Sequence, residues 1–232
     1  MCSRGQLYPN YDRVRKEKIV MDIIIRNETE NDYRVVEEMT REAFWNLYFP
    51  GCVEHYLVHT MRNHADFLQE LDFVAEYNGK IVGNIMYIKA SLMDELGKEM
   101  DIVSFGPLSV LPEYQRKGIG SALINHTKNI AIKNGVKAIV ILGDPHNYCK
   151  HGFKSAKDLN ISDINGNYPY GMLALELEEG VLAGHKWKYR YSDVYEINEK
   201  DADEYDNSFV KKEKGYRYSQ EIFSIAVRSY VK

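Results

Sequence analysis

The chain has 232 residues, of which 44% are hydrophobic and 28% charged, which is typical of a folded globular protein and excludes disorder of the whole chain. Its 34 acidic and 30 basic residues give a formal net charge of -4, so no basic excess indicates nucleic-acid binding as the main role. We expect a cytoplasmic protein of one main domain, because no apolar run approaches the roughly 20 residues of a membrane span and the three widely spaced cysteines form neither a disulfide framework nor a zinc-binding pair.

The chain begins with a polar stretch, followed by a first strand and a first helix. Residues 1–20 are polar and irregular, and we interpret them as an N-terminal extension. A strand-like run follows at 21–25. Thr29 and Asp32 have the spacing of a helix start, and apolar residues recur at helical spacing up to Phe44. The apolar face predicted for this helix consists of Val35, Val36, Met39 and Ala43.

A second helix and a β-hairpin come next. An aromatic loop at 45–52 precedes a helical stretch at 54–62. From Asp72 the apolar pattern becomes that of strands. Because Asn78 and Gly79 stand between two strand-like runs, they predict a hairpin with a type I′ turn.

The middle of the chain predicts a strand, a helix and two more strands. Residues 102–110 form a strand-like run, and a helix begins within 115–121 and is closed by Gly135. The nearly unbroken β-branched run 136–142 predicts a strand covered on both faces. Another strand is expected at 172–177. No internal repeat is visible in this pattern.

The C-terminal part contains three distinct segments. Residues 184–191 alternate basic and aromatic side chains, as an edge strand does and as a segment that binds nucleic acid or an acidic peptide also does. We favour the edge strand, because the whole chain is acidic. Residues 198–214 are charged and are predicted to form a loop. From Ser219 an amphipathic helix is expected, which packs on the core or on a second subunit, so a homodimer is one expected state.

The segment that links the strand 102–110 to the following helix has an unusual chemistry. Gly118 and Gly120 let the main chain turn tightly, so that successive N–H groups and the start of the helix point at one anion. Arg116 and Lys117 add positive charge at the rim. A phosphate-binding P-loop and a Rossmann turn are both excluded, because the P-loop spacing is absent and Leu123 stands where a third glycine is required.

This segment resembles the coenzyme A signature of the GNAT acetyltransferases. The family pattern Q/R-x-x-G-x-G/A is matched by Gln115, Gly118 and Gly120, and residues 148–153 resemble the family's Y-x-k-x-G-F element. The resemblance extends over 21–177 and is most similar to a bacterial subgroup whose members mostly lack assigned acceptors.

The resemblance implies a fold, a cosubstrate and a domain division. The fold is the α/β (α+β) GNAT fold, a mixed twisted central sheet flanked by helices, and the cosubstrate is acetyl-CoA. The acceptor is an unidentified amine on a small molecule or a peptide. Residues 21–178 are expected to form the GNAT domain, and 179–232 a C-terminal extension. The implied cofactor-binding residues are Leu108, Val110, Gln115, Arg116, Lys117, Gly118, Ile119, Gly120 and Ser121.

Tyr148 is the candidate catalytic residue, because it stands where the family places its general acid. A phenol with a reference pKa near 10 can protonate a departing thiolate with a reference value near 8.5, at a cost of about 2 kcal/mol. The oxyanion is expected to be held by backbone N–H groups near Val110. No base is assigned: Ser104 occupies the position of the family's glutamate, and Asp101, Glu113 or a chain of waters are the remaining options.

Weaker patterns are interpreted structurally. His55 and His59 are spaced as on one helix face, but the H-E-x-x-H zinc pattern is broken, and we predict no metal site. His146, Cys149 and His151 lack the second half of a zinc site, and Cys149 is predicted to be a small packing residue. Two functions from other classes remain open, namely a non-catalytic module that binds or senses acyl-CoA and a nucleic-acid-binding protein.

Overall fold

The computed structural model describes residues 21–232, so the expected extension at 1–20 lies outside the described residues. The strands are β1 (Ile24–Asn27), β2 (Phe73–Tyr77), β3 (Lys80–Met93), β4 (Glu99–Val110), β5 (Ala138–Leu142), β6 (Lys154–Ser155), β7 (Ile161–Ser162), β8 (Met172–Glu176) and β9 (Trp187–Arg190). The α-helices are α1 (Tyr33–Phe44), α2 (Glu54–Met61), α3 (Ile119–Lys133), α4 (Pro145–Tyr148), α5 (Glu199–Asp206) and α6 (Tyr218–Ala226). None of these helices has both the length and the apolar character that a membrane span requires.

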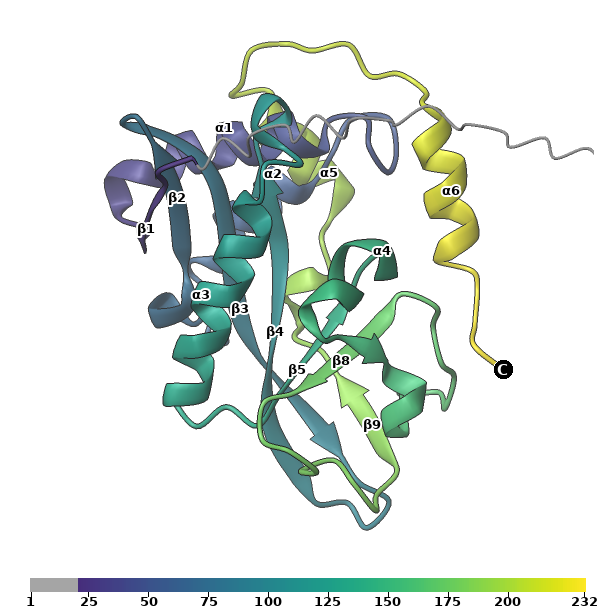
Figure 1. Cartoon of the computed structure of the whole chain (residues 1–232). Coiled ribbons are helices and arrows are strands. Elements are labelled where there is room, and N and C mark those ends of the chain that lie inside the picture. Colours follow the sequence, from purple (N-terminus) through teal and green to yellow (C-terminus); the bar gives the residue numbers. More distant parts are fainter. Residues whose placement is uncertain (1–20) are drawn as a thin grey trace, which may run out of the picture.

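The strands form one mixed sheet with the order β1-β2-β3-β4-β5-β8-β6, and β9 pairs with both β3 and β7. Most neighbours are antiparallel, whereas β4 with β5 and β7 with β9 are parallel. Helix α3 covers one face of the sheet, and α1 and α2 cover the other (Figure 1). The predicted mixed sheet flanked by helices is therefore confirmed.

The helix start and the hairpin turn predicted in the N-terminal half are both present. The Thr29 backbone N–H donates to Asp32 Oδ2 over 2.9 Å, which caps the start of the first helical segment. Asn78 and Gly79 both have positive φ angles, 50° and 75°, as a type I′ turn requires. On α1, Met39 is buried as predicted, but Val35 is 45% exposed, because it lies beside the buried stripe and not within it.

The C-terminal segments differ from two predictions. Residues 198–214 are not all loop: α5 forms because Asn198 Oδ1 accepts from the Lys200 N–H and because Ala202 is buried against the domain. β9 is a strand, as predicted, but not an edge strand, since it has a neighbour on each side. Trp187 and Tyr189 on this strand are buried, so the aromatic half of a nucleic-acid-binding surface is not available there.

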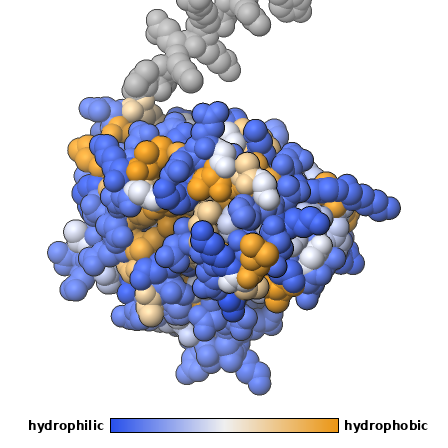
Figure 2. Space-filling model, turned by 90° about the horizontal axis from the view of Figure 1, so that it is seen from below, coloured by the Kyte–Doolittle hydropathy of each residue, from blue (hydrophilic) through white to orange (hydrophobic). Residues whose placement is uncertain are grey.

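Helix α6 confirms the last predicted helix but leaves much of its apolar surface open. Phe223 stacks on Tyr48 with the ring centroids 4.4 Å apart, whereas Ile222 and Ile225 are about 60% exposed. A different face of the molecule, seen from below in Figure 2, is largely hydrophilic with separate apolar spots. The expected homodimer stays a prediction.

A buried ion pair anchors α5 to α1. The Arg41 guanidinium donates to Asp206 Oδ1 over 2.6 Å and to Oδ2 over 3.0 Å, and the Arg41 side chain is 4% exposed. We expect Asp206→Ala to lower the free energy of unfolding by about 3 kcal/mol, because it leaves the buried arginine charge without its carboxylate and with only the Val210 carbonyl as hydrogen-bond acceptor. Thermal and urea unfolding measure this loss. The control is Asp203→Ala, also on α5, which removes an exposed ion pair with Lys214 and is expected to lower the free energy of unfolding by less than about 1 kcal/mol. Equal losses in the two variants would contradict the prediction.

Candidate active site

The candidate site begins where two central strands separate. The parallel strands β4 and β5 pair at Val103 and Ile139, and no register pair continues toward Val110. Over the same stretch β4 remains paired with β3, up to Gly83 opposite Val110 (Figure 1). The second half of β4 thus has no strand partner on its β5 side within the described chain. Backbone groups of this kind are available to an extended ligand.

The loop between β4 and α3 ends in an open helix start. Gly118 is the N-cap with a φ of 94°, and Arg116 also has a positive φ of 59°. The first helical bond runs from the Ala122 N–H to the Gly118 carbonyl. The preceding N–H groups have no acceptor within the helix and form a site suited to an anion; they belong to Ile119, Gly120 and Ser121.

The predicted cofactor residues of β4 and of the loop lie together. A Cβ atom added at Gly120 would be 3.7 Å from Leu108 Cδ2 and 3.8 Å from Val110 Cγ2, so these side chains lie under the first turn of α3. Gln115 Nε2 donates to the Val110 carbonyl over 3.0 Å and holds the loop against the strand. Arg116, Lys117 and Gly118 are exposed at the rim. The open N–H groups and the adjacent cations fit a pyrophosphate.

Tyr148 lies at the same end of β4. It is the last residue of α4, which begins after Asp144, whose side chain accepts from the His146 N–H. The Tyr148 ring packs against Phe105 of β4 and against Phe153, with centroid distances of 5.8 and 6.0 Å. Burial raises the pKa of Tyr148 above its usual value.

This shift changes the proton balance expected from reference values. Taken alone, the raised pKa of Tyr148 makes the free-energy cost of proton transfer to a thiolate larger than the value of about 2 kcal/mol estimated from reference pKa values. Desolvation raises the pKa of a thiol in the same way, as burial does for the Cys52 thiol in this structure. A thiolate leaving beside Tyr148 would be desolvated together with the phenol, which would narrow the difference between the two pKa values again.

Gly143 allows the Tyr148 ring to sit where it does. A Cβ atom added at Gly143 would lie 2.4 Å from Tyr148 Cε2, which is too close for the ring to stay in place. We expect Gly143→Ala to lower turnover about tenfold and the free energy of unfolding by about 1–3 kcal/mol. Gly215→Ala is the control, because its added Cβ meets only Asn46 Nδ2 at 3.8 Å. Unchanged turnover in Gly143→Ala would show that the position of Tyr148 is unimportant.

Neither residue considered for the base is well placed for that role. Ser104, at the position implied for a glutamate, has no carboxylate and is 3% exposed. Asp101 lies near the start of β4, opposite Ser91 and away from the loop. Glu113 forms an exposed pair with Lys80, 3.2 Å between charged atoms, and a backbone N–H and this lysine lower its pKa.

The comparisons with known proteins agree with this geometry. Residues 69–155, which include the loop and Tyr148, match the family model described as an acetyltransferase (GNAT) domain. The chain therefore contains a GNAT acetyltransferase domain over these residues. The predicted resemblance to this family is thereby confirmed.

Two Escherichia coli relatives and two solved structures are similar to this GNAT chain. It is 33% identical to the uncharacterized N-acetyltransferase YjhQ over 36% of the chain and 46% of that protein, which is less than half of the relative. It is 29% identical to the uncharacterized N-acetyltransferase YhbS over 58% of the chain and 75% of that protein.

The solved structures share the fold. The structure of YhbS with CoA has a TM-score of 0.66 and 22% identity, and covers 76% of this chain and 93% of its own. A Brucella melitensis GNAT acetyltransferase with acetyl-CoA has a TM-score of 0.58 and 24% identity, with 75% and 97% covered.

The histidines of α2 have separate partners in this GNAT chain. His55 is fully buried, with Nδ1 3.4 Å from Cys52 Sγ and Nε2 3.1 Å from Asp206 Oδ1, and burial lowers its pKa to about 4. His59 Nδ1 lies 3.1 Å from Glu37 Oε1. Within 21–232, one set of three side chains is close enough to hold a metal ion together, namely His64, Asp66 and Asp193.

In the turn after Tyr148, the predicted packing of Cys149 is wrong. Cys149 is exposed and does not pack, because it lies on the outer side of the short turn that follows α4. His151 Nε2 lies 3.3 Å from Ser121 Oγ and connects this turn to the start of α3. No sequence pattern indicated that contact.

Proposed function

We propose that this GNAT chain transfers the acetyl group of acetyl-CoA directly to a primary amine carried by a small molecule or a peptide. One observation supports the proposal: Tyr148 packs on Phe105 of β4, the strand whose second half is unpaired on one side and leads into the open start of α3. These are an anion site, a backbone edge and a proton donor, which acyl transfer from a phosphorylated thioester requires.

The cofactor roles follow from the loop geometry. The N–H groups at the start of α3 bind the pyrophosphate, and Arg116 and Lys117 add a salt-dependent attraction at the rim. The backbone of Leu108 and Val110 pairs with the pantetheine arm. In this proposal the thioester lies beside Phe105, against which Tyr148 packs.

The reaction then needs no acyl-enzyme. The amine nitrogen attacks the thioester carbonyl, whose developing oxyanion is held by backbone N–H groups near Val110. The C–S bond breaks, and the Tyr148 hydroxyl gives its proton to the departing thiolate. The proton that the attacking nitrogen loses passes through water to the Tyr148 phenolate, so one proton moves from nitrogen to sulfur overall. Backbone N–H groups thus stabilise the oxyanion, and the Tyr148 phenol is the acid.

Thiol release in the presence of a panel of primary amines tests this function. An amine-dependent increase that requires acetyl-CoA supports it. The alternative, a non-catalytic acyl-CoA-binding module, is favoured by Ser104, a buried side chain that cannot act as a base, at the position where the family carries a glutamate. Binding of acetyl-CoA without thiol release from any amine would establish that alternative.

The cellular compartment and the domain division are also part of the proposal. Cys52 is a buried free thiol and Cys149 an exposed one, which suits a reducing compartment such as the cytoplasm. The division at residue 178 between a GNAT domain and a C-terminal extension remains our proposal. Limited proteolysis near that position tests the division.

A further inference from the structure

His151 joins the turn after Tyr148 to the open start of α3. Its Nε2 atom lies 3.3 Å from Ser121 Oγ, and its side chain is partly exposed. Ser121 is the third residue of α3, so its own N–H is one of the groups that have no acceptor within the helix. A serine Oγ lies within about 4 Å of the backbone nitrogen of its own residue. The imidazole therefore stands beside the N–H groups that suit an anion.

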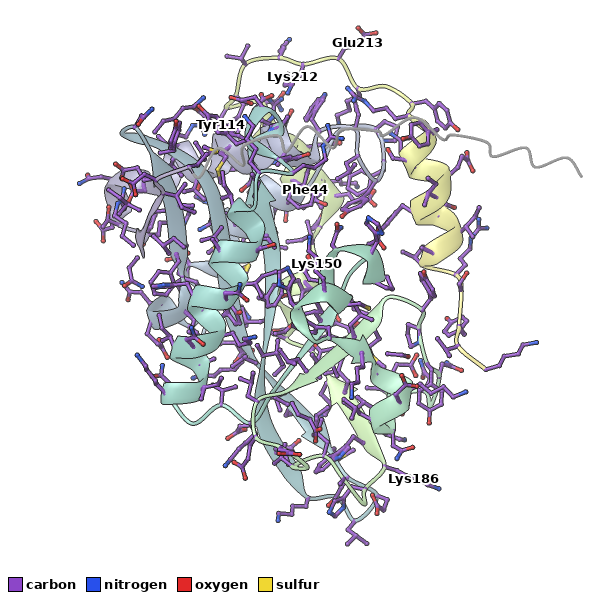
Figure 3. All side chains as sticks on the ribbon, viewed as in Figure 1. Phe44, Tyr114, Lys150, Lys186, Lys212 and Glu213 are labelled. Atoms are coloured by element: carbon purple, nitrogen blue, oxygen red, sulfur yellow. The ribbon has the colours of Figure 1, made fainter. Side chains whose placement is uncertain are left out.

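In the absence of an anion, the surroundings of His151 disfavour its charged form. Burial is the largest cause that lowers its pKa, and the charges of Lys150 and Lys128 lower it further. Lys150 lies where the turn runs beside α3, the helix that carries Lys128 (Figure 3). The start of a helix also bears a partial positive charge, which acts in the same direction. The imidazole of the free protein is therefore neutral at neutral pH, and it shares a hydrogen bond with the Ser121 hydroxyl.

A pyrophosphate at the start of α3 reverses this balance. It brings a negative charge on each phosphate, and a nearby negative charge favours the protonated imidazole. Both ring nitrogens of a protonated histidine are donors, so Nε2 then donates to Ser121 Oγ. The hydroxyl hydrogen of Ser121 is thereby free to point at the anion. The same contact that is unfavourable for a charged His151 without a ligand becomes favourable with one.

Resting on the proposed function, we propose that His151 is a positioning residue of the cofactor site, which takes up a proton when the pyrophosphate of CoA binds and directs the Ser121 hydroxyl toward it. The proton comes from the solvent and is held on the imidazole, and no covalent bond forms or breaks. Affinity for the cofactor therefore increases as the pH falls, because protonation of His151 and binding of the pyrophosphate favour each other.

The other groups around His151 do not account for such a pH dependence. None of them is of a type whose reference pKa lies between 6 and 7.5: they are Cys149 and Lys150 of its own turn, Asp144 and Tyr148 of α4, Lys128 of α3, and Arg116 and Lys117 of the loop. Two further histidines belong to the same elements. His126 of α3 packs against Phe73 of β2, with the ring centroids 4.8 Å apart. His146 of α4 is exposed and provides the control.

Calorimetric titration with 3′-dephospho-CoA tests the inference. This ligand keeps the pyrophosphate and lacks the 3′-phosphate, whose own second pKa near 6 would add a pH dependence. We expect wild type to bind it about fourfold more tightly at pH 6 than at pH 7.5, within the range for a partly exposed ion pair. Titrations at pH 6.5 in two buffers of different ionisation enthalpy should show uptake of a fraction of a proton.

His151→Gln is the test variant and His146→Gln its matched control. Glutamine keeps a hydrogen-bonding group beside Ser121 but cannot gain a charge. We expect His151→Gln to bind 3′-dephospho-CoA at pH 7.5 within about twofold of wild type, with neither pH dependence nor proton uptake. His146→Gln should retain both.

The outcomes separate this inference from the proposed function. Equal pH dependence in His151→Gln and wild type would overturn the role of His151, and so would an equal loss of affinity at both pH values, which indicates a purely structural contact. Binding of acetyl-CoA without binding of 3′-dephospho-CoA would place the anion contacts at the 3′-phosphate and contradict it as well. Absence of thiol release with every amine would remove the proposed transfer and leave His151 standing as a residue of the CoA site.

Discussion

Gly120→Glu is expected to weaken acetyl-CoA binding about 1000-fold, as measured by calorimetric titration. The added carboxylate would stand at the first turn of α3, where we propose that the open N–H groups donate to the pyrophosphate. Two like charges about 4 Å apart near a protein surface repel by about 4 kcal/mol, which corresponds to that loss of affinity.

The structure allows this variant to fold. The first added atom, Cβ, would be in ordinary contact with Leu108 and Val110 at 3.7 and 3.8 Å, and Gly120 has no positive φ. Gly120→Ala is therefore the matched control, and thermal unfolding should show both variants near the wild type. If Gly120→Ala loses as much affinity as Gly120→Glu, space and not charge decides binding. Undiminished affinity in Gly120→Glu would place the cofactor elsewhere.

Tyr148→Phe is expected to lower kcat about 100-fold and to leave acetyl-CoA affinity unchanged. The hydroxyl is the only group removed, and general acid catalysis accounts for a factor of about 100 or more. Because burial raises the pKa of Tyr148, the phenol remains protonated across the neutral range, and its loss should lower the rate at every pH from 6 to 9. Steady-state kinetics and calorimetry give the two quantities.

The phenylalanine ring keeps the packing against Phe105 and Phe153, so stability should change little. Tyr218→Phe is the control, because Tyr218 is 76% exposed on α6. A wild-type rate in Tyr148→Phe would remove the phenol from the mechanism. A large loss of stability would instead show that the hydroxyl is structural.

Local patterns in the sequence determined most of the elements and the cofactor loop. The Asn78-Gly79 turn, the cap at Thr29 and Asp32, and the positive φ at Gly118 follow from the preferences of those residues within a few positions of the chain. The glycine spacing before α3 was therefore visible without the tertiary structure. Local chemistry also indicated Tyr148 through its resemblance to the family element.

Only the tertiary structure decided the contacts made over long sequence separations. α5 was predicted as loop because its residues are charged, yet Asp206 pairs with Arg41, 165 residues earlier in the chain. The crowding of Gly143 by Tyr148 depends on how α4 packs beside β4. Burial and ion pairing are properties of the assembled core, so residues that acquire their pKa and position there have no signature in the sequence alone.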